Sequence, residues 1–390
     1  MLMRAASGLG EVGQEGVPVE ASWSQRFHDL TPESQHVIRA CAVLGRTPLS
    51  QNAAAAALST PLTAAGNVFT ALVDAGWGAA VDDQLGIRFV VDPDSSPFLY
   101  RLVRQTPLDD VQTIIERVAA SVENLLTSGS PLSPAVRDNV LGVLRAANWH
   151  DMPQDALSLA HAVWETLLPG VVGAVGAGAD VGGAEIDVAW WRVVAEEGEQ
   201  AASRTRQPHR LVDLLDRSAR LYSAAGDWQG AEAALIRAAY LMNRLNDGDE
   251  YDRYLELLAT TYHDAGQTTA FVTTLEELVD RYERDDKPDR AASALARIGA
   301  TLLGTTQFAS AIRYLEQADR LLANLPETND LRTRRAEVLC NIGRIHAQRG
   351  AINSARTYYR DALALVVDVD QQAERHVREL QASLPSGSPD

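Results

Sequence analysis

The segment "LLDRSARLYSAAGDWQGAEAALIRAA" (residues 214–239) carries a pattern that three later segments repeat. Its second leucine is followed four positions later by a small residue, and three positions after that by a large one. A glycine then interrupts the apolar pattern, and another small residue lies five positions beyond it. The later segments are "LELLATTYHDAGQTTAFVTTLEEL" (255–278), "LARIGATLLGTTQFASAIRYLEQA" (295–318) and "LCNIGRIHAQRGAINSARTYYRDA" (339–362). Self-similarity of this kind predicts a row of similar helical hairpins.

The aligned positions resemble those of tetratricopeptide (TPR) repeats, which are small where two helices touch and large where they interdigitate. Equivalent turns are 40, 40 and 44 residues apart. Because the usual TPR period is ~34 residues, we expect longer helices or longer connections here. The matched positions are Leu215, Leu255, Leu295 and Leu339; Ala219, Ala259, Gly299 and Gly343; Tyr222, Tyr262, Leu302 and His346; Gly226, Gly266, Thr306 and Gly350; and Ala231, Phe271, Ala311 and Ala355.

The region ahead of the repeats predicts three helices followed by a hairpin. Thr31 is placed to cap the first helix, with Pro32 at its first position. Short apolar runs around Asp-Asp-Gln predict the hairpin. This order of elements is that of a winged helix. The segments are "LTPESQHVIRACAVLG" (30–45), "LSQNAAAAAL" (49–58), "PLTAAGNVFTALVDAGW" (61–77) and "GAAVDDQLGIRFVV" (78–91).

We therefore expect a mainly α protein, with an N-terminal winged-helix domain that includes a small β-hairpin, followed by a TPR-like α-solenoid. Trp149, Trp164, Trp190 and Trp191 lie around a degenerate helical hairpin and are expected to form a core at the junction between the winged helix and the solenoid. The predicted domains are a flexible N-terminus (1–23), the winged-helix-like domain (24–105), a helical linker and degenerate hairpin (106–206) with a Gly-rich loop (169–184), four TPR-like repeats (207–367), and a capping helix with a disordered tail (368–390).

The stretch "GVVGAVGAGADVGG" (residues 170–183) raises the possibility of a nucleotide site. A dinucleotide fingerprint needs G-x-G-x-x-G between a strand and a helix, but here Gly182 comes one residue too late after Gly176 and Gly178. The preceding segment predicts a helix that ends at Pro169, and no lysine is present for a Walker loop. An expanded turn within a helical hairpin is therefore the favoured interpretation.

Composition narrows the classes of function. The chain has 35 Lys and Arg against 52 Asp and Glu, a net charge of −17, which opposes binding to nucleic acid and to anionic membranes. The two cysteines, Cys41 and Cys340, indicate no disulfide framework and fit a reducing cytosol. The first residues lack the apolar core of a secretory signal. We therefore expect a cytoplasmic protein.

No pattern of catalytic or ligand residues stands out. The eight histidines form no HExxH motif and do not pair with cysteine at metal spacing, and no Gly-x-Ser-x-Gly motif occurs. The sequence thus predicts neither an enzyme nor a cofactor or metal site.

Polar residues on the first helices of the repeats predict a peptide-binding groove. Guanidinium groups bind carboxylates in a bidentate manner, and asparagine can hold a peptide backbone. An acidic or carboxylate-bearing protein or peptide ligand would suit such a groove. The alternative, left open, is that these arginines pair with Asp213, Asp216 and Glu256 on neighbouring helices. The candidates are Arg217, Arg220, Arg253, His263, Arg297, Asn341 and Arg344.

A winged helix also suggests a transcriptional regulator that reads DNA through its third helix. Residues 62–75 contain no Arg or Lys, and residues 24–105 contain six Arg against seven acidic residues. Because phosphate contacts need cations, a role in packing or protein contact is favoured over DNA binding.

Two segments resemble bacterial regulators of the STAND class (NB-ARC type), including actinobacterial antibiotic regulators with TPR tails. "GVPVEASWSQRFHDLTPESQHVIRACAVLG" (16–45) looks like the start of their winged helix, and "VLGVLRAANWHDMPQDALSLAHAVWETLL" (140–168) like the helical linker that follows. The ATPase that precedes this junction in the family is not matched. The resemblance implies a sensor and interaction half without nucleotide switching, and hence a regulatory, non-enzymatic scaffold. The sequence does not indicate the oligomeric state.

Overall fold

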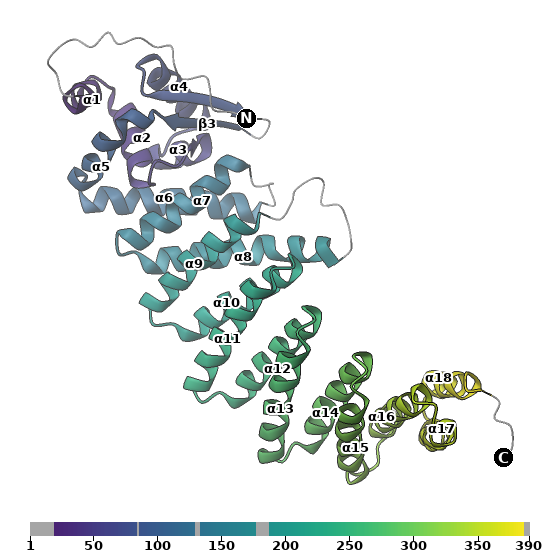
Figure 1. The fold of residues 1–390 in the computed structure, drawn as a ribbon. Helices are drawn as coiled ribbons and strands as arrows, with labels where there is room; N and C mark the ends of the chain where they lie inside the picture. The colour runs from purple at the N-terminus through teal and green to yellow at the C-terminus, as the bar shows by residue number, and fades with distance from the viewer. Residues whose placement is uncertain (1–18, 84–85, 129–132, 177–186, 386–390) are drawn as a thin grey trace. The chain divides into compact units, whose positions relative to one another are not determined.

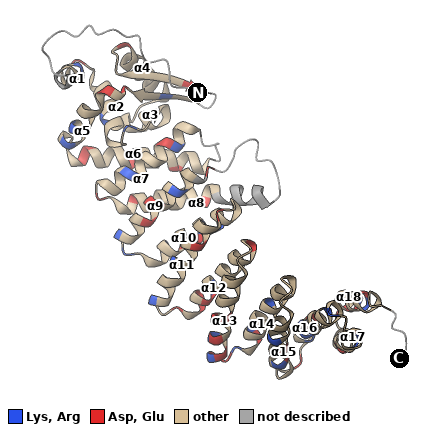
Figure 2. Cartoon of the chain, viewed as in Figure 1, with Lys and Arg blue, Asp and Glu red and all other residues tan. Residues whose placement is uncertain are grey.

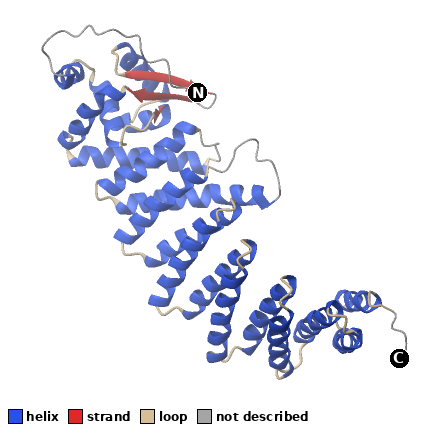
Figure 3. Cartoon of the chain, viewed as in Figure 1, coloured by secondary structure: helices blue, strands red, loops and turns tan. Residues whose placement is uncertain are grey.

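The computed structural model describes residues 19–83, 86–128, 133–176 and 187–385, which are helical apart from one small sheet (Figures 1 and 3). The chain divides into two compact units at residues 225 and 226, the turn predicted inside the first repeat. Unit 1 therefore ends with the first helix of that repeat, and unit 2 begins with the second. The predicted domain boundaries at 105/106, 206/207 and 367/368 stay predictions.

The N-terminal part of unit 1 combines four helices with a three-stranded antiparallel sheet in the order β1-β3-β2. Phe89 of β3 is opposite both Leu49 of β1 and Ala80 of β2. Thr31 caps the second helix as predicted, since its Oγ1 accepts from Ser34 N at 3.3 Å. The elements are α1 (Val19–His28), α2 (Pro32–Val43), β1 (Leu49–Ser50), α3 (Gln51–Leu58), α4 (Leu62–Asp74), β2 (Gly78–Asp83) and β3 (Gly86–Val91).

Aromatic rings fill the core of this part. Phe69 and Phe89 stack with ring centroids 5.6 Å apart, which fixes α4 against the sheet. The buried Trp77 lies 4.9 Å from Trp23 of α1. Offset and tilted ring pairs of this kind add ~0.5–1.5 kcal/mol each beyond the burial of apolar area.

The rest of unit 1 is a stack of longer helices. The rings of Trp164 and Trp191 are 4.4 Å apart, so α8 and α9 pack as the predicted degenerate hairpin. Trp190 also belongs to this core, 5.1 Å from Trp191. The elements are a 3₁₀ turn, η1 (Pro93–Ser95), α5 (Ser96–Gln105), α6 (Leu108–Thr127), α7 (Pro134–Trp149), α8 (Pro153–Gly176), α9 (Val188–Arg204) and α10 (Pro208–Ala224).

Two expectations about this part are wrong. Helix α8 does not end at Pro169 but continues to Gly176, so the Gly-rich loop cannot begin at 169. A proline inside a helix removes one N–H donor without preventing the next residues from taking helical angles. The remainder of that loop, residues 177–186, lies outside the described residues. The second error concerns Trp149: it is the last residue of α7, and 77 % of it is exposed rather than buried in the core.

Unit 2 is a TPR-like stack in which each helix packs against the next (Figure 1). In unit 2 the left-handed turn residues Asn246, Gly266, Asp286 and Thr306 recur every 20 residues, with φ between 56° and 71°. At each of these turns a backbone N–H donates to the carbonyl oxygen five residues earlier, as Gln267 N does to Tyr262 O at 2.8 Å. The elements are α11 (Trp228–Arg244), α12 (Gly248–Asp264), α13 (Thr268–Arg284), α14 (Pro288–Gly304), α15 (Phe308–Ala323), α16 (Asn329–Gln348), α17 (Ile352–Val366) and α18 (Gln371–Ala382).

These turns explain the repeat spacing. Two helices of 17 residues and two short turns make up the 40-residue period. The last spacing is 44 because α16 has 20 residues and residues 324–328 form a longer connection. The expectation of longer helices or longer connections is therefore confirmed.

Among the described residues, no single helix is long and apolar enough to cross a membrane. Helices α3 and α4 meet the length and composition criteria only as a pair, and that pair is bent by 104°.

Candidate functional site

The predicted groove residues divide between the two units. Arg217 and Arg220 lie on α10 in unit 1, whereas Arg253, His263, Arg297, Asn341 and Arg344 lie on α12, α14 and α16 in unit 2. Acidic and basic residues share these helices (Figure 2), so the local partners of each candidate decide what it can bind.

In unit 1 both arginines have acidic partners. Arg217 Nε is 3.0 Å from Asp213 Oδ2, and its Nη2 is 3.6 Å from Glu165 Oε1 of α8. Arg220 Nη2 is 2.8 Å from Asp216 Oδ2, one helical turn away. Asp213 and Asp216 lie on α10 itself, so these two ion pairs are not between neighbouring helices as the pairing interpretation had them; only the contact with Glu165 joins two helices. Both guanidinium groups are nevertheless engaged within the unit.

His161 of α8 adjoins this pair, with its Nδ1 3.4 Å from Asp213 Oδ2. Burial lowers the pKa of His161 from 6.5, an effect that Asp213 partly opposes and that Arg210 and Arg217 reinforce. The imidazole is therefore neutral at neutral pH, and its contact with Asp213 adds no ionic attraction there.

In unit 2 three candidates also have acidic neighbours. Arg297 Nη1 of α14 donates to Glu256 Oε2 of α12 at 2.6 Å, and the same carboxylate accepts from Tyr282 OH at 3.0 Å. Arg253 Nη1 is 2.7 Å from Glu250 Oε2, and His263 Nδ1 is 3.2 Å from Asp264 Oδ1. Arg297 thus joins two helices of the stack instead of presenting an open guanidinium group.

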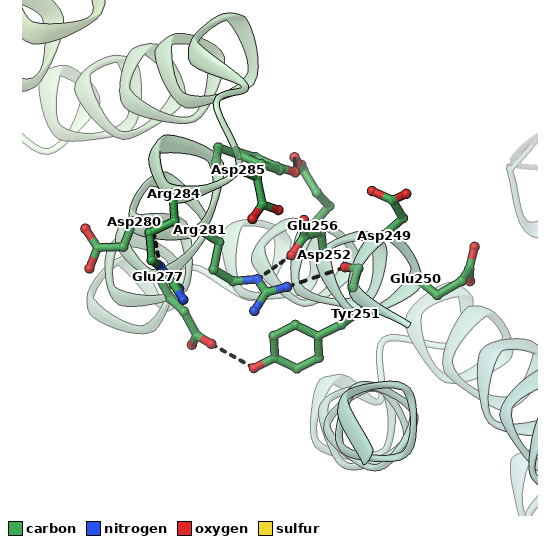
Figure 4. Close-up of polar contacts among 12 residues, drawn as sticks. Asp249, Glu250, Tyr251, Asp252, Glu256, Glu277, Asp280, Arg281, Arg284 and Asp285 are labelled. Atoms are coloured by element: carbon green, nitrogen blue, oxygen red, sulfur yellow. Dashed lines mark hydrogen bonds and ion pairs between the residues drawn. The ribbon is translucent and has the colours of Figure 1, made fainter. Parts of the chain in front are cut away.

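A more deeply buried ion pair, absent from the predicted set, lies between α12 and α13 (Figure 4). Arg281 Nε donates to Asp252, whose side chain is 1 % exposed. The guanidinium carbon also lies 4.5 Å from the ring centroid of Tyr251, and Tyr251 OH donates to Glu277 at 2.7 Å. Because the carboxylate is buried and paired with Arg281, these residues link α12 to α13 and do not form an open site.

Asn341 and Arg344 differ from the other candidates. Arg344 Nη1 donates to Asn341 Oδ1 at 3.4 Å, and among the described residues Arg344 has no carboxylate within ion-pair distance. Both side chains line a pocket of about 460 Å³ between α16 and α18. The other polar residues of its lining are Thr333, Glu337, Asp370, Gln372 and His376.

The sequence analysis did not predict that α18 lines this pocket, because residues 368–382 were expected only to cap the stack. Helix α18 does pack on α17 and α16, and in doing so it closes one side of the pocket. The composition of α18 could have indicated this role. Most residues of "QQAERHVREL" (371–380) are polar, and Val377 is the only one of them that is buried.

The pocket offers no reactive thiol. Burial raises the pKa of Cys340 to about 12, and Glu337 contributes in the same direction. The thiol is therefore protonated at neutral pH and unsuited to nucleophilic attack or metal binding. Across the described part of the chain, no three His, Cys, Asp or Glu side chains gather as a metal site would require.

One family model matches the part of the chain that contains the repeats. The family model for SNAP, the soluble NSF attachment protein, matches residues 199–371, less than half of the chain. No curated protein matches the chain. Together with the observed stack of antiparallel helices, the family match describes a TPR-like repeat fold.

Three solved structures are similar to the chain at low sequence identity. BtubC (BKLC) from P. vanneervenii is 15 % identical with a TM-score of 0.39, over 69 % of this chain and 95 % of its own. A putative kinesin light chain with TPR-like repeats from Podosopora anserina is 14 % identical with a TM-score of 0.38, over 64 % and 98 %. A STAND protein with a TPR sensor from Pyrococcus horikoshii is 12 % identical with a TM-score of 0.39, over 95 % of this chain and 56 % of its own.

Proposed function

We propose that this chain is a non-enzymatic scaffold with a regulatory role, and that its TPR-like repeats bind a protein or peptide ligand. The observation that carries the proposal is the side-by-side arrangement of Asn341 and Arg344 on the 460 Å³ pocket between α16 and α18. Asn341 can hold a backbone amide of an extended ligand, and Arg344 can pair with a carboxylate.

The acidic partners of the other candidates narrow this proposal. Arg217, Arg220 and Arg297 already bind carboxylates of the protein itself, so a ligand would have to displace them. Arg344 has no such ion pair among the described residues, so a ligand carboxylate would displace none there, although Glu337 and Asp370 also line the pocket. The ligand we expect is therefore a peptide that ends in, or contains, a carboxylate that reaches Arg344.

Peptide arrays test the proposal. Full-length protein is applied to peptides with free C-terminal carboxylates and to the same peptides with amidated ends. We expect preferential binding of the free acids, reduced at least about tenfold by Arg344→Glu and Asn341→Ala. Arg349→Glu, at the exposed end of the same helix and outside the pocket, is the matched control and should change little. Equal binding of acids and amides, or equal loss in the control, would remove the pocket as the site.

A second candidate function is DNA binding by a winged helix. The order α2-β1-α3-α4 followed by the β2-β3 hairpin, with β1 added to the sheet edge, supports a winged-helix assignment for residues 24–105. Helix α4, in the place of a recognition helix, has the sequence LTAAGNVFTALVD and offers no cation to phosphates. We therefore favour a protein contact over DNA for this part of the chain.

A further inference from the structure

A second pocket lies within unit 1. It has a volume of about 560 Å³ and is formed by the end of α2, by α5 and by the end of α7. Its floor is apolar, with contributions from Ala42, Leu99 and Val103. A cavity of this size accommodates one or two large apolar side chains of a partner.

The rim of this pocket carries two exposed aromatic side chains. Trp149 is 77 % exposed and Tyr100 is 58 % exposed. Both rank among the most exposed large hydrophobic residues of the described chain. Tryptophan and tyrosine beside an apolar depression are the residues that most often dominate the energy of a protein interface.

The charge of the rim is opposite to that of the whole protein. Arg46, Arg104 and Arg145 line the pocket, and none of its lining residues is Asp or Glu, although the chain carries a net charge of −17. Arg104 is held in place at the rim, because its Nη2 donates to Tyr100 OH at 2.7 Å and its guanidinium lies over that ring at 4.6 Å.

The other two arginines remain accessible. Arg46 is exposed and has no carboxylate within ion-pair distance among the described residues. Arg145 Nε lies 3.6 Å from Glu197, and the Arg145 side chain is still half exposed. The rim thus presents cationic groups on an apolar depression, which is complementary to apolar residues flanked by carboxylates.

We propose that this pocket docks an acidic amphipathic segment of a partner protein. Large apolar side chains of the segment enter between Trp149 and Tyr100, and its flanking carboxylates pair with Arg46 and Arg104. The exposed face of Trp149 argues for a macromolecular partner, since a small molecule in the pocket would leave much of that indole in water. This site is independent of the α16–α18 pocket and of the ligand proposed for it.

Selection from a library of random peptides, each long enough for about four helical turns, tests the proposal on the full-length chain. We expect enrichment of peptides that combine Leu, Phe or Trp with several Asp or Glu. Their affinity should fall at least about tenfold with Trp149→Ala and with Arg46→Glu plus Arg104→Glu, while far-ultraviolet circular dichroism stays unchanged. Binding should also weaken as salt is added.

Tyr240→Ala is the matched control, because Tyr240 of α11 is as exposed as Tyr100 but lies in unit 2. Failure to enrich acidic, apolar peptides would overturn the proposal, as would enriched peptides whose affinity survives both pocket variants. Self-association in sedimentation that disappears with Trp149→Ala would show that a second copy of the chain occupies the pocket, and it would overturn the proposed partner.

Discussion

Gly343 of α16 lies against the ring of Tyr359 of α17 so closely that a Cβ at position 343 would be 2.5 Å from Tyr359 Cε1. Position 343 is one of the small positions of the repeat pattern that the sequence displays. The contact shows why that position must be small: the two helices of the hairpin approach each other through it.

We therefore expect Gly343→Ala to destabilise the protein. The overlap with a buried ring should cost about 1–3 kcal/mol, more than the ~1 kcal/mol that alanine gains in helix propensity. Gly304→Ala is the control, since a Cβ at position 304 meets nothing within 4 Å. Urea unfolding should show a lower midpoint for the first variant and an equal or higher one for the second; the reverse order would contradict the packing argument.

Thr306 occupies the turn position that Gly226, Gly266 and Gly350 occupy in the other repeats, with φ at 61°. A left-handed conformation costs a non-glycine residue ~1–2 kcal/mol, whereas glycine in place of another residue loses ~0.5–1 kcal/mol more conformational entropy on folding. Thr306→Gly should therefore raise the melting temperature slightly. Gly266→Thr should lower the melting temperature. A lower melting temperature for both variants would contradict the claim that glycine is favoured at these left-handed turn positions.

The turns and the repeat were predictable because they depend on local sequence. The left-handed turn at Gly266 reports the conformation of a few neighbouring residues. The small residues Gly299 and Gly343 report contacts with Leu315 and Tyr359, which lie on the next helix of the same hairpin, 16 residues further along the chain. The same holds for Thr31 at the start of α2, whose capping bond spans three residues.

The state of the candidate site depends on contacts that are distant in sequence. Arg297 and Glu256 are 41 residues apart, and only the packing of α14 near α12 makes them partners. Trp149 and Trp164 look alike in sequence, yet one is exposed and the other fully buried. The pairing of an arginine and the burial of a tryptophan depend on which side of its helix faces the neighbouring helix. The sequence pattern alone does not specify that side.

Arg281 and Asp252 should form the costliest ion pair to break in unit 2. Arg281→Leu leaves a carboxylate that is 1 % exposed without its partner, and we expect a loss of about 3–5 kcal/mol. The double variant Arg281→Leu with Asp252→Asn should recover part of that loss, because the buried charge is then absent. A double-mutant cycle from urea unfolding measures the coupling, and additive single effects would be inconsistent with the pair.

The stability of unit 1 should depend on pH through His161. Burial holds the pKa of His161 in the folded state below 6.5, so the unfolded state binds a proton first as the pH falls. The contribution of neutral His161 to the free energy of unfolding is therefore fully present above about pH 6.5. It is lost as the pH falls towards the pKa that His161 has in the folded state.

His161→Gln should reduce the fall in unfolding free energy between about pH 7.5 and about pH 5.5. Urea unfolding at the two pH values, for the parent and the variant, gives the difference directly. His376→Gln, a change at the α16–α18 pocket, is the comparison. An unchanged slope in His161→Gln would exclude His161 as the source.

The proposed winged helix should not bind DNA. Helix α4 exposes Leu62 and carries Asp74 at its end, and its sequence contains no Arg or Lys. Because non-specific affinity comes from cations that displace counterions from phosphate, we expect no binding of random duplex DNA even at about 50 mM salt, where such contacts are strong. Fluorescence anisotropy of a labelled duplex measures this binding.

Asn67→Arg plus Thr70→Arg adds two cations at exposed positions of α4 and should introduce weak, salt-sensitive binding if that face can reach the duplex. Salt-dependent binding by the parent protein would contradict this prediction. It would mean that the chain binds DNA through cations that lie outside α4.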